Sequence, residues 1–299
     1  MKLLIKSFMR FLILMPYFIS SKWAFFLSFF HWYFRDVHLD WKSNDLENLK
    51  LDVIHHSNSA GKVNLSFYTP NALCLFRANT FSTKEPETLE WIEEFGVNSA
   101  TLFDIGANVG LYSIYHAVIN KGKVAAFEPS FFNLKQLTKN INLNSCQDRI
   151  NIISTPLSSE NGIQNFIYGS SVEGGALSAF GVDFGYDGNK LNVDLSAKVL
   201  GMSLDFMKEN GFIDSIPNLV KIDVDGIEHI ILSGARNTLT HKDCKSVLIE
   251  VNDDFSEQSF EVDKLLTEYG FILRDKKHGD FLEKSEKFSS TYNQIWIKL

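Results

Sequence analysis

The sequence is poor in cysteine. Its 299 residues include only Cys74, Cys146 and Cys244, which lie far apart and outside any C-x-x-C pattern. Neither a disulfide framework nor a cysteine-based zinc site is indicated, and a reducing, cytoplasmic location is expected. A hydrophobic fraction of 45% and a charged fraction of 22% are typical of a globular chain, which excludes wholesale disorder.

Positive charge is scarce everywhere except at the N-terminus. The chain has 29 basic and 36 acidic side chains, a net charge of −7. Residues 1–35 contain five basic and no acidic side chains, so they carry +5 and the remainder carries −12. A body this acidic lacks the basic surface that binding to a phosphate backbone requires. No nucleic-acid partner is therefore expected.

Long apolar runs are also missing from the N-terminal segment, although it is rich in aromatic residues. Pro16 and Ser20-Ser21-Lys22 divide residues 11–34 into runs of roughly ten residues, whereas a membrane-spanning helix needs about 20. No cleavage site of a secretory signal follows Ile19. The spacing of four between Lys2, Lys6 and Arg10 predicts a helix with one basic face.

Two interpretations of residues 1–35 stay open. The segment is either an anchor at an anionic membrane surface or an apolar helical extension packed on the main domain. An anchor would place the protein at the inner membrane face, where lipid-linked sugars are assembled. The anchor is contradicted if deletion of residues 1–35 leaves the partition between membrane and soluble fractions unchanged.

The rest of the chain divides into residues 36–84, predicted as a connector and hairpin, and a main domain at 85–299. The hairpin prediction rests on β-rich runs at 63–69 and 72–78, separated by Pro70-Asn71. A strand at 101–105, a helix at 111–119 and a strand at 123–127 form a βαβ unit. Further strand-like runs lie at 150–154, 219–224, 247–251, 271–274 and 294–298. This alternation predicts a doubly wound, mainly parallel α/β sheet.

A glycine loop follows the first strand of the βαβ unit. Residues 103–110 read F-D-I-G-A-N-V-G, which is neither the G-x-G-x-x-G of dinucleotide sites nor a phosphate loop. Asp104 would repel a pyrophosphate but suits a ligand with an ammonium group, such as the methionine part of S-adenosylmethionine. Glu128 ends the next strand and can accept hydrogen bonds from both ribose hydroxyls. Capping of the following helix is the structural alternative for Asp104.

From about Arg77 onward, these motifs make the chain similar to the FkbM family of S-adenosylmethionine-dependent methyltransferases. The resemblance rests on DIGANVG at 104–110, FEP at 127–129, KIDVDGIE at 221–228, LSGA at 232–235 and LIE at 248–250. Where the family usually reads E-G-A-E, residues 225–228 read D-G-I-E, which keeps both acids.

The resemblance implies a Rossmann-like class I methyltransferase fold, with a seven-stranded, mainly parallel sheet, helices on both faces and an antiparallel last hairpin. It implies transfer of a methyl group to a hydroxyl oxygen, often of a sugar in a surface glycan or of a secondary metabolite. A segment at 156–158 resembles the one that the family places beside the adenine. The implied cofactor-binding residues are Asp104, Gly106, Ala107, Asn108, Gly110, Glu128, Leu157 and Ser158.

A second group of charged residues ends another hydrophobic strand. Lys221, Asp223 and Asp225 alternate along the chain, so Lys221 and Asp223 face the same side. An alcohol attacks well only as it loses its proton, and a positioned base contributes roughly 10²- to 10⁴-fold. We predict Asp223 as this base, with Lys221 as an alternative base or its ion partner, and Asp225 beside them. Asp225 and Glu228 also match a helix-capping pattern.

The sequence leaves a divalent metal undecided. Asp223 together with Glu250, Asn252 or Asp253 would offer oxygen ligands of the kind that magnesium accepts.

Residues 164–190 form an insertion with six glycines interleaved with five aromatic residues. Two interpretations stay open: a substrate platform or lid, or a β-hairpin extension packed by its aromatic side chains. Arg77, Lys84 and Glu87 are predicted to join the substrate edge.

Three functions are consistent with these patterns. The first is methyl transfer to a hydroxyl of a small molecule or glycan; the others are methyl transfer to a secondary metabolite or a nitrogen acceptor, and cofactor binding without catalysis. Neither the acceptor nor the oligomeric state follows from the sequence.

Overall fold

The computed structural model describes residues 47–191, 193–279 and 288–298. The predicted N-terminal helix and anchor at 1–35 lie outside these residues and stay predictions. The chain divides into two units, Met1–Leu49 and Lys50–Leu299, and the sheets of the described residues belong to the second. Within the described residues, no helix combines the length and the apolar character needed to cross a membrane.

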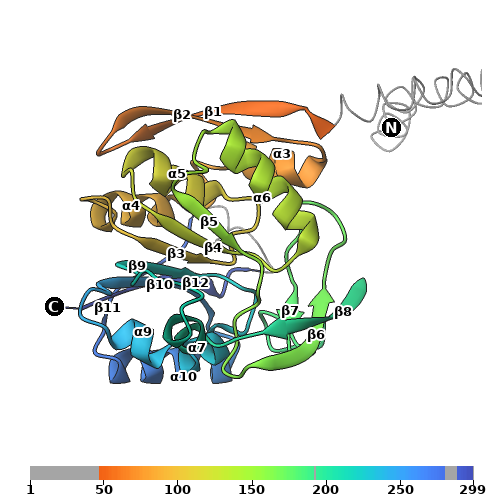
Figure 1. Cartoon of the computed structure of the whole chain (residues 1–299), viewed down its shortest axis with the longest axis vertical. Coiled ribbons are helices and arrows are strands. Elements are labelled where there is room, and N and C mark those ends of the chain that lie inside the picture. The colour runs from red at the N-terminus through yellow and green to blue at the C-terminus, as the bar shows by residue number, and fades with distance from the viewer. Residues whose placement is uncertain (1–46, 192, 280–287, 299) are drawn as a thin grey trace, which may run out of the picture. The chain divides into compact units, whose positions relative to one another are not determined.

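A seven-stranded sheet forms the centre of the second unit, in the order β11-β12-β10-β9-β3-β4-β5 (Figure 1). β5, β4, β3, β9 and β10 are parallel, and β12 runs antiparallel to both β10 and β11. This confirms the mainly parallel α/β sheet with an antiparallel last hairpin. The strands are β3 (Leu102–Ile105), β4 (Val124–Phe127), β5 (Ile150–Ile153), β9 (Leu219–Ile222), β10 (Ser246–Asn252), β11 (Ile272–Lys277) and β12 (Thr291–Ile297).

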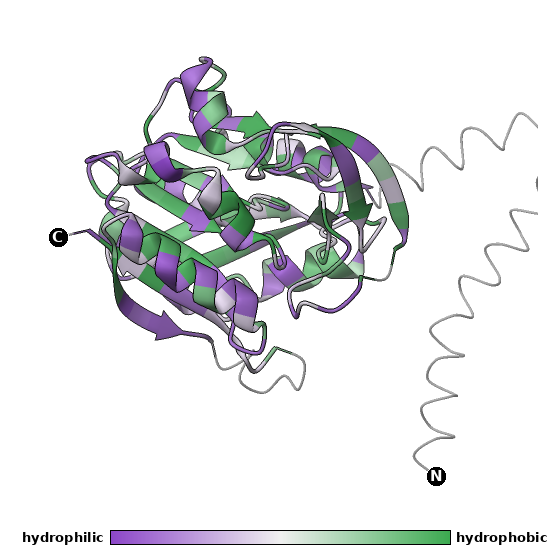
Figure 2. Cartoon of the chain, turned by 90° about the horizontal axis from the view of Figure 1, so that it is seen from below, coloured by the Kyte–Doolittle hydropathy of each residue, from purple (hydrophilic) through white to green (hydrophobic). Residues whose placement is uncertain are grey.

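Helices cover both faces of the sheet because its central strands are apolar on both sides. Every residue of β3, β4 and β9 is buried, as expected for strands enclosed between helical layers, and Figure 2 shows the strands inside the molecule as mostly hydrophobic. One face is covered by α4 (Pro86–Phe95), α5 (Leu111–Ile119) and α6 (Phe131–Leu143). The other is covered by α7 (Leu204–Glu209), α8 (Glu228–Ser233), α9 (Arg236–Thr240) and α10 (Ser256–Glu268).

The N-terminal hairpin lies earlier in the chain than predicted. Strands β1 (Lys50–Ser57) and β2 (Gly61–Tyr68) form it, so β1 falls in the part interpreted as connector. The strand predicted at 72–78 is wrong, because these residues belong to helix α3 (Ala72–Asn79). Asn71 decides this locally: its side-chain oxygen accepts the N–H groups of Leu73 and Cys74 and caps the helix.

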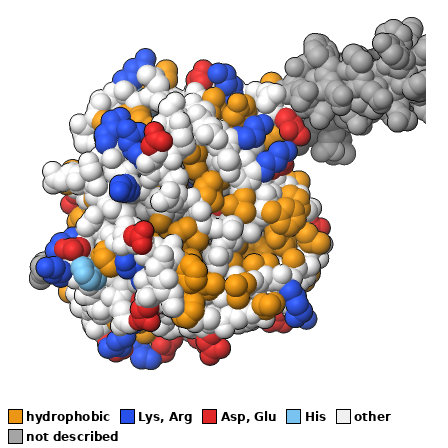
Figure 3. Space-filling view, in the orientation of Figure 1, with side chains coloured by type: hydrophobic (Ala, Val, Ile, Leu, Met, Phe, Trp, Pro, Cys, Tyr) orange, Lys and Arg blue, Asp and Glu red, His pale blue; other side chains and the backbone are white. Residues whose placement is uncertain are grey.

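The glycine-rich insertion belongs to a small antiparallel sheet of β7 (Ala179–Phe180), β6 (Gly162–Tyr168) and β8 (Leu195–Gly201). Phe166, Tyr168 and Phe180 are buried against the core, which is the packed β extension of the two interpretations. Its outer face carries exposed apolar side chains, and Figure 3 shows hydrophobic side chains gathered there. Ile163 and Leu200, paired across β6 and β8, are 67% and 49% exposed.

Candidate active site

Two adjoining cavities lie where the carboxyl ends of β3, β4 and β9 meet. This is the edge at which open α/β sheets bind ligands. The first cavity is lined by the ends of these strands, residues 155–157 and part of the glycine-rich insertion. The second lies between the glycine loop and residues 77–85. Gly106, Asn108 and Asp223 line both cavities and therefore mark their junction.

Gly106 brings the ends of β3 and β9 into contact. Its φ is +88°, and a Cβ placed there would lie 1.9 Å from the carbonyl oxygen of Asp223. Only glycine fits this position, because the clash is with backbone. Ala107 lines the second cavity, whereas Gly110 lines neither and begins α5 with a φ of +90°.

Glu128 and Asn108 connect the first cavity to the glycine loop. The Glu128 carboxylate accepts the N–H groups of Asn108 and Ser130, each at 2.8 Å. Burial raises the pKa of Glu128 to about 7. The Asn108 amide donates to the Gly175 carbonyl at 2.7 Å, while its Oδ1 is buried and accepts no hydrogen bond from the described residues.

Asp104 lies beneath the cavities and lines neither. It is 1% exposed, and burial raises its pKa. Its Oδ2 accepts the Ser113 hydroxyl, in the first turn of α5, at 2.5 Å. Its Oδ1 accepts no hydrogen bond from the residues the structure describes. Asp104 thus binds the first turn of α5 through Oδ2, while its Oδ1 can accept a further hydrogen bond.

The apolar half of the first cavity contains Leu157, as the resemblance implied, together with Phe127, Phe166 and Phe180. Ser158 does not line it; its N–H donates to the Met202 carbonyl. Phe166 and Phe180 belong to the aromatic insertion that one of the two interpretations made a substrate platform. Phe127 was not predicted as a site residue, because its place in a buried strand marks it only as core.

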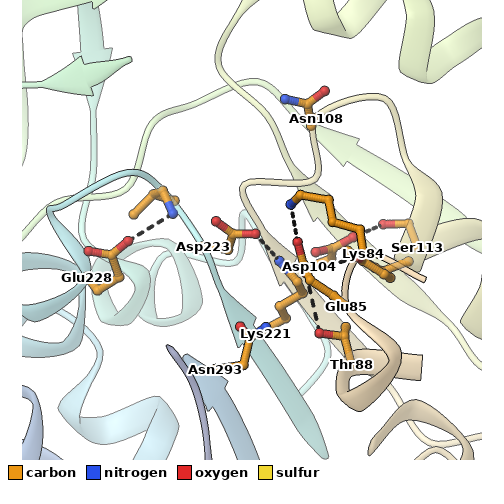
Figure 4. Close-up of polar contacts among 12 residues, drawn as sticks. Lys84, Glu85, Thr88, Asp104, Asn108, Ser113, Lys221, Asp223, Glu228 and Asn293 are labelled. Atoms are coloured by element: carbon orange, nitrogen blue, oxygen red, sulfur yellow. Dashed lines mark hydrogen bonds and ion pairs between the residues drawn. The ribbon is translucent and has the colours of Figure 1, made fainter. Parts of the chain in front are cut away.

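Two lysine–carboxylate pairs stand at the junction and in the second cavity (Figure 4). Lys221, which is 1% exposed, lies 2.6 Å from Asp223, and Lys84 pairs with Glu85. Tyr112 donates its hydroxyl to Glu85 at 2.9 Å, and its ring lies 5.1 Å from the Lys221 ammonium. Burial alone would lower the pKa of Lys221, but the surrounding carboxylates raise it well above its ordinary value. Lys221 is therefore a charged ion partner.

Glu85 and Tyr112 were not among the predicted site residues. In the sequence, Glu85 is simply the residue before Pro86, and Tyr112 is one of the aromatic residues of a predicted helix. Neither position by itself indicates a site. The available signal was the Lys84-Glu85 charge pair directly before an apolar helix.

Glu250 lies close enough to Asp223 to interact with it electrostatically. Burial, and then the negative charges of Asp223 and Glu85, raise the pKa of Glu250 well above its ordinary value. The Asn252 amide donates to the Tyr186 carbonyl, and Asp253 pairs with Lys276 at 2.6 Å. Among the described residues, no group of three or more His, Cys, Asp or Glu side chains could hold a metal ion.

Asp225 and Glu228 do not form the predicted capping pair. The Asp225 carboxylate accepts the N–H of Leu177 at 2.6 Å and thus fixes the insertion over the first cavity. Glu228 is the first residue of α8 and accepts the N–H groups of Val224 and Gly226 at 3.1 and 3.0 Å. Its role is structural: it shapes the loop that carries Asp225.

The chain is similar to known methyltransferases. A family model described as the methyltransferase FkbM domain matches residues 104–273, more than half of the chain. The hexuronic acid methyltransferase AglP of Haloferax volcanii is 29% identical over 187 residues, which cover 62% of this chain and 68% of that protein.

Among solved structures, the methyltransferase FkbM of Methylobacillus flagellatus shares 15% identity and a TM-score of 0.48. The match covers 77% of this chain and 54% of that one, so this chain spans about half of it. The precorrin-6y C5,15-methyltransferase of Geobacter metallireducens shares 11% identity and a TM-score of 0.42, with 72% and 87% covered. These likenesses are weak, whereas the family match spans both clusters of site residues.

Proposed function

Because the chain belongs to the FkbM methyltransferase family, we propose that it transfers a methyl group from S-adenosylmethionine to a hydroxyl oxygen of a sugar in a glycan or lipid-linked saccharide. The observation that carries the proposal is the junction of the two cavities. Asp223 and the glycine-loop residues Gly106 and Asn108 line both cavities, and Glu128 lines the first. The relative named as a hexuronic acid methyltransferase supports a sugar acceptor.

The residues present fit S-adenosylmethionine. Asn108, which lines both cavities, has a buried acceptor oxygen without a donor among the described residues, and an ammonium group supplies such a donor. Asp104, beneath the cavities, adds a negative charge that favours a cationic ligand. Glu128 lines the first cavity and is proposed to accept the ribose hydroxyls, and the phenylalanines beside Leu157 are proposed to contact an apolar ring. When bound, S-adenosylmethionine supplies a methyl group on a positively charged sulfur, which an oxygen nucleophile accepts by in-line displacement.

Asp223 is the residue proposed to accept the proton of the attacking hydroxyl. Its side chain is 25% exposed and reaches both cavities. One carboxylate oxygen is held by Lys221, so the group is fixed in orientation before an acceptor binds. Lys221 keeps its own proton and acts as a positioning residue. Asp225 is proposed to act through the insertion that it anchors.

The proposed function is tested by binding and transfer in sequence. Isothermal calorimetry with S-adenosylhomocysteine tests the cofactor. Transfer of an isotope-labelled methyl group to a glucuronide, a glucoside and an amino sugar, followed by mass spectrometry, then tests the acceptor. Label lost in mild alkali is a methyl ester on a carboxylate, whereas label that resists alkali is an ether or an N-methyl group. Alkali-stable label on the glucoside, which has neither a carboxylate nor an amine, identifies an ether on a hydroxyl. Absence of S-adenosylhomocysteine binding contradicts the proposal, and label found only on nitrogen contradicts the hydroxyl acceptor.

The affinity for S-adenosylhomocysteine is expected to fall as the pH is lowered from 8 to 6. Glu128, whose burial raises its pKa to about 7, gains a proton across this range and then accepts hydrogen bonds from ribose less well. A single proton weakens binding by at most about tenfold per pH unit below its pKa.

Calorimetry at several pH values measures this dependence. Burial also raises the pKa of Asp225 to about 6 and that of Glu228 to about 7. The Glu128→Gln variant is therefore needed to assign the pH dependence of binding to Glu128. That variant should bind weakly at every pH, with a flatter profile. An equally steep profile in Glu128→Gln would assign the effect to the other two carboxyls.

A location at the inner membrane face stays a separate proposal. It depends on residues 1–35 and is tested by their deletion.

A further inference from the structure

Arg77 carries a charge in the second cavity that no carboxylate of the described chain neutralises. The cavity is lined by three cations, Arg77, Lys84 and Lys221, and by two acids, Glu85 and Asp223. The two lysines pair with these acids. Arg77 makes no ion pair within 4.0 Å with any residue that the structure describes. Among the cations that line the cavity, Arg77 is therefore the one whose guanidinium group has no carboxylate partner in the described chain and is available to a ligand.

Two acids in the surroundings of Arg77, Glu173 and Asp225, have other partners. Glu173, on the neighbouring segment, lies 3.6 Å from Lys135. Asp225 lies close enough for Arg77 to act on its pKa, but its carboxylate accepts the Leu177 N–H. Neither acid forms an ion pair with the guanidinium group of Arg77.

The guanidinium group of Arg77 is held in position from one side. Arg77 stands in the last turn of α3, and its Nε donates to the Gly174 carbonyl at 2.8 Å. The same segment is fastened to the start of α3, because the Asn71 amide donates to the Glu173 carbonyl at 3.0 Å. No hydrogen bond to a described residue uses the two terminal amino groups of Arg77. A guanidinium fixed at Nε with its terminal nitrogens free matches the geometry of a carboxylate.

We propose that Arg77 binds a carboxylate of a ligand in the second cavity. This inference rests on the proposed function, which offers two such ligands: the methionine part of S-adenosylmethionine and an acidic sugar acceptor. The positive charge of Arg77, beside the paired lysines, favours an anionic group. Both ligands would be bound in the same way, by an ion pair between their carboxylate and the Arg77 guanidinium group.

The test compares ligands with and without the carboxylate on wild-type protein and on Arg77→Gln. The first ligand pair is S-adenosylhomocysteine and its decarboxylated analogue, measured by calorimetry. The second is methyl β-D-glucuronide and methyl β-D-glucoside, measured by ligand-observed NMR in the presence of S-adenosylhomocysteine. Arg236→Gln, which changes an exposed arginine paired with Glu268 on the protein surface, is the matched control.

If the cofactor supplies the carboxylate, wild-type protein prefers S-adenosylhomocysteine over its decarboxylated analogue by about 10- to 100-fold. Arg77→Gln removes that preference by weakening S-adenosylhomocysteine alone. If the acceptor supplies it, S-adenosylhomocysteine affinity stays within about twofold and only the preference for the glucuronide is lost. Arg77→Lys keeps the positive charge but lacks the two parallel N–H donors of the guanidinium group, so it should retain part of the preference in either case.

The proposal is overturned if wild-type protein shows neither preference, or if Arg77→Gln keeps both. It is also overturned if Arg77→Gln weakens S-adenosylhomocysteine and its decarboxylated analogue equally, which would indicate that Arg77 only supports Gly174. A failure of the proposed function looks different, because wild-type protein would then not bind S-adenosylhomocysteine at all. If Arg77→Gln does not fold, the comparison of Arg77→Lys with wild type decides between these outcomes.

Discussion

Asp223→Asn is expected to lower methyl-transfer turnover by about 10²- to 10⁴-fold, the usual contribution of a positioned base. The asparagine amide has nearly the same shape as the carboxylate and can still accept a hydrogen bond from Lys221, but it cannot take a proton from a hydroxyl. Lys221 also keeps the negative charges of Asp104 and Glu85 in its surroundings, so the variant should fold. S-adenosylhomocysteine affinity should change little.

Single-turnover kinetics and calorimetry on the same preparation measure the two quantities. Because the lost group acts in the transition state, kcat and kcat/KM for the acceptor should fall together. Asp253→Asn is the matched control: it removes an acid that follows the neighbouring strand β10 but pairs with Lys276 outside the cavities, and it should keep wild-type turnover. Full turnover in Asp223→Asn would refute Asp223 as the base.

Gly106→Ala is expected to lower S-adenosylhomocysteine affinity by more than about 10²-fold, because a misplacement of about 1 Å in a site has effects of this size. The new Cβ would lie 1.9 Å from the carbonyl oxygen of Asp223 and 2.9 Å from its carbonyl carbon, and backbone cannot swing aside as a side chain can. Either the glycine loop or the end of β9 must move. Asp223 and the N–H groups of Gly106 and Ala107, which donate to Phe127, would be displaced.

The free energy of unfolding should also fall, by about 1–3 kcal/mol for overpacking in addition to the strain of a positive φ. Gly211→Ala separates these two effects. Its φ is +70° and a Cβ there has no atom within 4 Å, so it reports the backbone strain alone. Chemical denaturation of both variants measures the difference. Equal destabilisation, with binding intact in Gly106→Ala, would show that the contact with Asp223 does not matter.

Much of the fold followed from local patterns. The run of residues 101–127 predicted β3, α5 and β4 to within a residue, because a buried strand, a glycine turn and an amphipathic helix each leave a signal within about ten residues. The strand predicted at 72–78 failed for a related reason. Apolar residues in a short run suit either a strand or a helix, and the capping by Asn71 chose the helix.

Some residues of the site could also be predicted from the sequence, and others could not. Glu128, Asp223 and Asp225 could be placed from the sequence because carboxyl ends of parallel strands meet at one edge of a sheet, whereas Leu157 was implied only by the family resemblance. Arg77 and Lys84 were expected only at the substrate edge in general, and Glu85 was not expected. These residues reach Lys221 through the packing of α3 and α4, more than 130 positions earlier in the chain, and no local period carries that information.

The sequence by itself therefore determined the α/β sheet, the family resemblance and which strands end in acids, because each depends on neighbours in the chain. Only the tertiary structure decided how the charges are paired. It showed Lys221 as the ion partner of Asp223, one of the two roles that the sequence left open, and it paired Lys84 with Glu85. It also engaged Asp225 with the insertion and left Arg77 without a carboxylate among the described residues. Charge pairing inside a protein depends on distances of a few ångströms and on burial, and packing between distant segments sets both.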